Sequence, residues 1–261
     1  ASGYVQDPTY LADASVPQGT DCKTVPLGFT SRVCGPGALY VAHGGTVFAS
    51  GLYASLWTRS TIAGTLTMSD GSFLWGNTTI VSGGVLTAGI MYFHGELQIA
   101  SGATATIAQL RVDKWGAAQA ASNPQLVIAN QGTLTFALRA PARLTYEYNW
   151  DMISTYDSSN IDVVILLLNQ GSMSFLASPT NLVDLKAQPC AGLNMNIVNH
   201  GTVTWSGMEQ FFTGTGTTIN YGELIAINAN VYLSDYASHG GTLNTSSNGY
   251  FNFGNGAGPD T

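Results

Sequence analysis

The chain has 261 residues, of which 9% are charged and 45% are apolar, and its net charge is −7. The acidic balance and the scatter of the eight Lys and Arg residues exclude a nucleic-acid-binding surface, which needs clustered cations. The longest purely apolar run, 163–168, is far shorter than the about 20 residues of a spanning helix, so we expect no membrane span.

Residues 1–38 contain four prolines, two cysteines and few alternating apolar residues. We expect an extended N-terminal segment braced by a disulfide between Cys22 and Cys34, because closing such a loop stabilises a fold by about 3 kcal/mol. Cys190 is then left over, either as a buried thiol or as a partner for another chain. The segment is expected to cap the first repeat or to contact a neighbouring molecule.

From residue 39 to 254 the chain repeats one short pattern of strand, turn and strand, with apolar residues at alternate positions. In the second half the turn reads Asn-x-Gly, at Asn130–Gly132, Asn169–Gly171, Asn199–Gly201 and Asn220–Gly222. In the first half glycines open the strands instead, at Gly45, Gly64, Gly84 and Gly102. We expect Leu134, Met173 and Val203 to lie in register inside the molecule.

The first four turn glycines follow one another at steps of 19, 20 and 18 residues, which is typical of a solenoid repeat. Apolar residues recur with period two, and Thr, Val, Ile, Tyr and Phe dominate, so the repeats are strands. Gly and Asn suit the corners because both tolerate positive φ. The prediction is an all-β fold, a single-domain parallel β-helix, with a β-sandwich array as the alternative.

In coil length and corner chemistry, residues 39 to about 255 resemble the right-handed parallel β-helix superfamily. That group includes pectin-lyase-like proteins, phage tailspikes and the passenger parts of bacterial adhesins. The resemblance implies a single solenoid domain. The sequence holds no catalytic motif that would assign it to one branch of the superfamily.

Three insertions are expected in the middle of the solenoid, near 111–124, 137–160 and 176–194, and a flexible tail at 255–261. The second insertion is the main site candidate. It brings three acids, Glu147, Asp151 and Asp157, together with the aromatic residues Tyr146, Tyr148, Trp150 and Tyr156. This combination suits the stacking of sugar rings and attack on a glycosidic bond, or Ca²⁺ binding, or a loop that only covers the side of the solenoid.

Two sequons, at Asn77 and Asn244, are candidate glycosylation sites. The four histidines, His43, His94, His200 and His239, each precede a glycine, but their spacing does not place them on adjacent coils. We therefore interpret them as corner residues rather than as metal ligands, and we expect no metal and no cofactor.

The scarcity of charge favours a secreted, glycosylated or self-associating protein, and the Ala-Ser-Gly start is compatible with removal of a signal peptide. No amphipathic helix covers the ends of the repeat region, so its terminal strands are expected to be open to other chains. The sequence predicts an extracellular structural protein that polymerises head-to-tail into a filament, sheath or adhesin stalk. The alternatives are a carbohydrate-active β-helix enzyme, for which Glu147, Asp151 and Asp157 are the catalytic candidates, and a monomeric carbohydrate-binding adhesin.

Overall fold

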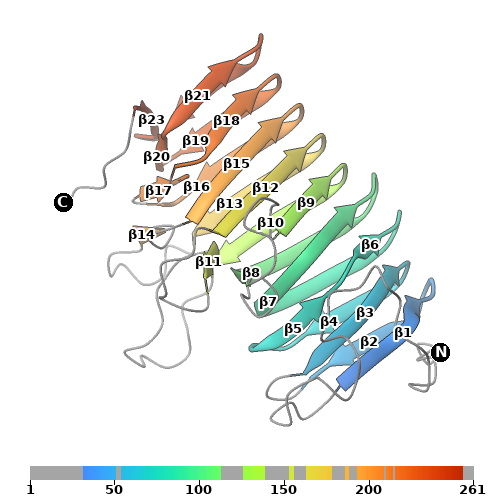
Figure 1. Cartoon of the computed structure of the whole chain (residues 1–261). Helices are drawn as coiled ribbons and strands as arrows, with labels where there is room; N and C mark the ends of the chain where they lie inside the picture. Colours follow the sequence, from blue (N-terminus) through green and yellow to red (C-terminus); the bar gives the residue numbers. More distant parts are fainter. Residues whose placement is uncertain are drawn as a thin grey trace.

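The computed structural model describes residues 32–50, 54–112, 126–138, 153–155, 163–177, 186–187, 193–208, 210–213 and 215–254. Every regular element within these residues is a β-strand, and every strand pair is parallel. Figure 1 shows the strands stacked in chain order along one axis, from β1 in blue to β21 in red. The predicted β-solenoid is confirmed, and parallel pairing excludes the β-sandwich alternative, whose sheets are antiparallel.

One long side of the solenoid, face A, is a parallel sheet of nine strands. Alternate residues point inward, so that Leu126 and Ile128 are buried while Val127 between them is half-buried. In stacking order its strands are β1 (Arg32–Val41), β3 (Ser55–Ile62), β6 (Thr78–Ile80), β7 (Val85–Ile99), β9 (Leu126–Asn130), β12 (Val163–Asn169), β15 (Leu193–Asn199), β18 (Thr217–Asn220) and β21 (Asp235–Ser238).

The second long side, face B, is also a parallel sheet of nine strands and follows face A across a tight corner, the A–B corner. Its strands are β2 (Thr46–Ala49), β4 (Thr65–Met68), the start of β7, β8 (Thr104–Val112), β10 (Thr133–Leu138), β13 (Ser172–Ala177), β16 (Thr202–Ser206), β19 (Glu223–Ile227) and β22 (Thr242–Ser246).

A third and shorter side, face C, closes each coil. In the first half its rungs are parts of longer strands: β7 pairs with β4 on face B, with β5 (Ser72–Trp75) on face C and with β6 on face A. The remaining strands of face C are β11 (Ile153–Thr155), β14 (Lys186–Ala187), β17 (Gln210–Phe212), β20 (Asn230–Leu233) and β23 (Tyr250–Phe253). Each turn of the solenoid therefore has three sides.

The interior is filled by columns of side chains that repeat from coil to coil. Leu134, Met173 and Val203 are paired in register and fully buried, as predicted. The neighbouring column stacks Phe136 on Phe175 and Phe175 on Trp205, with ring centroids 5.0 and 5.7 Å apart. Near-parallel offset rings of this kind add about 0.5–1.5 kcal/mol per pair beyond the burial of their area.

The coils differ in length, but the described strands show where the extra residues enter. The segments 139–152 and 178–185 lie between strands of face B and face C, and 113–125, 156–162 and 188–192 lie between strands of face C and face A. The short strands β11 and β14 fall inside the predicted second and third insertions, and residues 32–34, from the predicted N-terminal segment, already pair with β3.

The glycines of the A–B corner are of two kinds. Gly44, Gly83, Gly102 and Gly240 have positive φ, between 71° and 85°. Of the four first-half glycines expected at the turns only Gly102 is among them, because Gly45, Gly64 and Gly84 do not have positive φ. In the Asn-x-Gly corners the expectation of positive φ is wrong, because neither Asn nor Gly is among the described residues with positive φ. Glycine is required there for space: a Cβ on Gly171 would overlap the carbonyl oxygen of Gly132 one coil away.

This close approach predicts the effect of Gly171→Ala. The added methyl group must push two coils apart, and we expect a loss of about 1–3 kcal/mol of stability, as for other overpacked sites. Urea unfolding followed by far-UV circular dichroism measures it. Gln170→Ala, an exposed change at the adjacent position, is the control; equal unfolding midpoints for the two variants would show that the corner has room for a side chain.

Candidate functional site

The residues of the predicted carbohydrate site lie outside the described residues. This holds for Glu147, Asp151, Asp157, Tyr146, Tyr148, Trp150 and Tyr156, and also for Cys22 and Cys190. Cys34 lies in β1, where its backbone pairs with Trp57. The carbohydrate site and the Cys22–Cys34 disulfide therefore stay predictions.

Both sequon asparagines are described, and both side chains are exposed. Asn77 precedes β6, and its backbone carbonyl accepts a hydrogen bond from Ser60 N at 3.0 Å. Asn244 lies in β22, where its Nδ2 donates to Glu223 Oε1 at 2.5 Å. A glycan on Asn244 would be attached to this same nitrogen, so glycosylation there has to compete with the Glu223 contact. None of the described residues makes such a contact with the Asn77 side chain.

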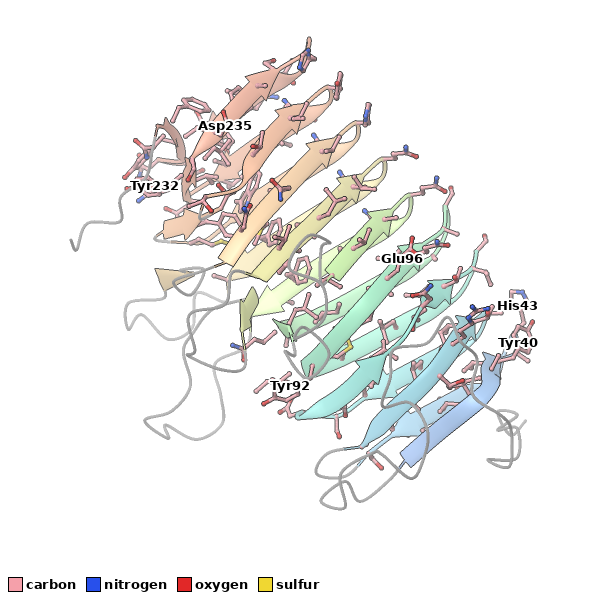
Figure 2. All side chains as sticks on the ribbon, in the orientation of Figure 1. Tyr40, His43, Tyr92, Glu96, Tyr232 and Asp235 are labelled. Carbon is pink, nitrogen blue, oxygen red and sulfur yellow. The ribbon has the colours of Figure 1, made fainter. Side chains whose placement is uncertain are left out.

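The described acids are dispersed. Asp70 accepts a hydrogen bond from Ile90 N at 3.0 Å, Glu96 from Gln98 Nε2 at 2.9 Å, and Asp235 from Thr217 Oγ1 at 2.9 Å. Figure 2 shows Glu96 and Asp235 far apart along the solenoid. Among the described residues, no two of Asp70, Glu96, Glu223 and Asp235 share a face on adjacent coils, so these four do not form an acid–base pair.

Three of the histidines share one corner and one does not. His43, His200 and His239 all lie at the A–B corner, where His200 and His239 are separated by a single coil. His94 lies instead at the end of the face C part of β7, before Gly95 with its φ of 122°. No group of three metal-ligating side chains occurs among the described residues.

A ladder of buried asparagines runs through the Asn-x-Gly corners. Asn130 Nδ2 donates to Asn169 Oδ1 at 2.8 Å, Asn169 Nδ2 to Asn199 Oδ1 at 2.8 Å, and Asn199 Nδ2 to Asn220 Oδ1 at 2.9 Å. All four side chains are at most 1% exposed. The ladder links four successive coils with one direction of hydrogen bonding.

Each asparagine of the ladder also binds the backbone around it. The Oδ1 of Asn199 accepts from Gly201 N at 3.1 Å, which closes the corner, and its Nδ2 donates to the Glu223 carbonyl of the next coil at 3.1 Å. The same two contacts occur at Asn130, with Gly132 and Ser172. A buried amide is costly without partners, so this complete set of bonds is what permits a polar column inside the fold.

The middle residue of each Asn-x-Gly corner forms a second, exposed row. Gln131 Nε2 donates to Gln170 Oε1 at 3.1 Å. Farther along, the ring of Tyr221 stacks between His200 and His239, with centroid distances of 4.4 and 5.0 Å. Sequence reasoning missed this row, although the signal was present: planar side chains recur at the same position of the repeat.

The two ends of the described solenoid expose apolar and aromatic side chains. At the first coil Phe48 is 70% exposed and Tyr40 47%, and at the last coil Phe253 is 52% exposed and Leu243 37%. On the coil before it, in β20, a hydrogen bond with Tyr250 of the last coil, together with burial, raises the pKa of the Tyr232 phenol. Figure 2 shows Tyr40 and Tyr232 near opposite ends of the molecule.

The described residues contain no helix that could cross a membrane. A scan against protein-family models, a search of curated proteins and a search of solved structures each give no match for this chain.

The asparagine ladder predicts a large effect for Asn169→Ala. The change removes the acceptor of Asn130 Nδ2 and the donor to Asn199 Oδ1, and each buried group left without its partner costs about 1–3 kcal/mol. Asn220→Ala, at the end of the ladder, breaks only one asparagine–asparagine bond and should cost less. Urea unfolding of the two variants, with Gln170→Ala as the control, measures which one loses more unfolding free energy. Equal losses of stability for Asn169→Ala and Asn220→Ala would contradict a continuous ladder.

Proposed function

We propose that this protein is an extracellular structural subunit that assembles head-to-tail into a filament, sheath or adhesin stalk. The observation that carries the proposal is that the strands at both ends of the described solenoid have an unpaired edge. Within the described residues, β21, β22 and β23 each pair with only one strand, and so do β1 and β2. Strands with one free edge are templates for the addition of another chain.

The two ends match each other in sequence and in conformation. The A–B corner of the first coil reads His43-Gly44-Gly45-Thr46, and that of the last coil reads His239-Gly240-Gly241-Thr242. Gly44 and Gly240 have similar backbone conformations, with φ of 71° and 85°. If β2 of one copy pairs with β22 of another, Thr46 follows Thr242 and the inward Val47 follows the inward Leu243, as in successive coils of one chain.

Such a contact uses different surfaces on the two copies and leaves a free end after each addition. A contact of this type produces an open fibre rather than a closed ring. It would cover the inward side chains of Val47 and Leu243, of which Leu243 is exposed in the single chain. The low charge content, 9%, supports the proposal because little electrostatic repulsion opposes the stacking of copies.

The extracellular placement is supported by the predicted Cys22–Cys34 disulfide and by the exposure of both sequon asparagines. The alternatives, a carbohydrate-active enzyme or a carbohydrate-binding adhesin, depend on the acids and aromatic residues of 137–160. The dispersed acids of the described coils give these alternatives no further support.

Head-to-tail assembly predicts opposite behaviour for two matched variants. Leu243 and Leu176 are both 37% exposed, but Leu243 lies on the last coil and Leu176 in the middle of face B. Leu243→Lys places a charge in the proposed contact, where an unpaired charge is strongly unfavourable, and should prevent polymerisation. Leu176→Lys should not. Sedimentation velocity and negative-stain microscopy over a range of concentrations measure both.

A mixing experiment separates the two ends. Val47→Lys places a charge at the inward position of the first coil, and Leu243→Lys does so at the last coil, so each variant alone should remain monomeric. Together they retain one free end of each kind and should form a dimer that does not grow. A wild-type chain that stays monomeric at the highest soluble concentration would refute the proposed assembly.

A further inference from the structure

The outer surface of face B carries a two-column array of threonine and serine. Six successive strands, β4, β7, β8, β10, β13 and β16, each contribute two outward residues, and these are paired in register from strand to strand. The pairs are Thr65 with Thr67, Val85 with Thr87, Thr104 with Thr106, Thr133 with Thr135, Ser172 with Ser174, and Thr202 with Thr204. Val85, which has the shape of threonine, is the only member without a hydroxyl group.

The array is regular in two directions. Parallel strands lie about 4.8 Å apart, and outward residues of one strand are separated by two rises of about 3.3 Å each. Threonine is branched at Cβ and has few side-chain rotamers, so its methyl and hydroxyl groups are held at positions that repeat with the same spacing as the backbone. The side chains thus form a nearly rectangular grid of hydroxyl groups, with a methyl group beside each hydroxyl of the threonines.

The interior of the solenoid holds this grid in place. The backbone carbonyls of Ser172 and Thr202, which belong to the first column, accept hydrogen bonds from the ladder residues Asn130 and Asn169 at 2.9 and 3.0 Å. Beneath the array, Phe136, Phe175 and Trp205 stack with planes within 10° of parallel. The grid is therefore anchored from within.

The extra residues of the middle coils interrupt other parts of the solenoid. They enter between strands of faces B and C or of faces C and A, and the A–B corners beside the array remain tight. The register of the two columns is unchanged from β8 to β16, although the loops between these strands differ in length. A surface whose periodicity is kept through such variation suits a partner that is itself periodic.

The array is also free of charge, since none of its twelve positions is ionisable. Face A differs, because its outward side chains include Arg59, Glu96 and Asp235 as well as the apolar Leu166 and Leu168. An anionic or cationic surface therefore finds no counterpart within these twelve positions, and the first charged residue along the column is Glu223 on the following strand, β19. What fits is a flat, neutral, periodic partner that accepts and donates hydrogen bonds at every lattice point.

We propose that face B binds the surface of ice. The oxygen atoms on faces of ordinary ice repeat along two perpendicular directions at intervals close to those of the array. Hydroxyl groups at these intervals take the place of lattice waters, and the methyl groups between them order the water in the gaps. Because the backbone already fixes the grid, little further ordering of the protein is needed on binding.

The test compares two matched pairs of substitutions in the full chain. Thr106 and Thr135 are neighbours in register on face B, and Thr61 and Thr79 are neighbours in register on the outside of face A. Labelled protein is added to water in which a single ice crystal grows slowly, and the fraction incorporated into the ice is measured. We expect the wild type and the Thr61→Lys/Thr79→Lys variant to be incorporated, and Thr106→Lys/Thr135→Lys to lose about tenfold or more of incorporation, equivalent to about 1.4 kcal/mol of binding.

Two further measurements keep the outcome decisive. Circular dichroism confirms that each variant is folded, and Thr106→Ser/Thr135→Ser, which keeps the hydroxyl groups, should retain part of the incorporation. The Leu243→Lys background separates ice binding from filament formation, because it leaves face B intact from β4 to β16. Exclusion of the wild type from ice, equal losses for the face A and face B pairs, or binding of face B to crystalline cellulose or chitin with no incorporation into ice would overturn the proposal.

Discussion

The parallel backbone hydrogen bonds between successive coils fix the position of every side chain in this solenoid. Because each coil is paired residue by residue with the next, equivalent positions form columns along the axis. A slip of one residue would turn each inward column outward. The asparagine ladder opposes such slips, since a displaced Asn169 would be buried without the Asn130 and Asn199 partners that it now has. Corner, interior and outer surface all follow from this single register.

Much of the architecture could be predicted from the repeated Asn-x-Gly motif. A motif that returns once per coil brings the same residue types to the same position of successive coils, so these residues stack on one another. The burial and pairing of Leu134, Met173 and Val203 follow directly from it. The role of the glycines could not be predicted in this way. Positive φ and lack of space for a Cβ both select glycine, and only the position of the Gly132 carbonyl beside Gly171 distinguishes them.

The candidate site was harder to predict because sequence reasoning searches for clusters of reactive side chains. It therefore drew attention to Glu147, Asp151 and Asp157 in an insertion, which lies outside the described residues. The threonine columns contain no reactive group, and the distance between Thr106 and Thr135 along the chain hides their pairing. Their order becomes visible only when the register of the coils is known.

The same repetition has a mechanical consequence. In a parallel solenoid the hydrogen bonds between coils run along the long axis, and each coil is held mainly by its two neighbours. A force that pulls the two ends apart loads the bonds of the outermost coil first, so that the coils peel away one after another at low force. The asparagine ladder spans Asn130 to Asn220 and reinforces only the coils of the second half. Under axial tension the solenoid behaves as a zipper whose first half, β1 to β8, opens more easily than its second.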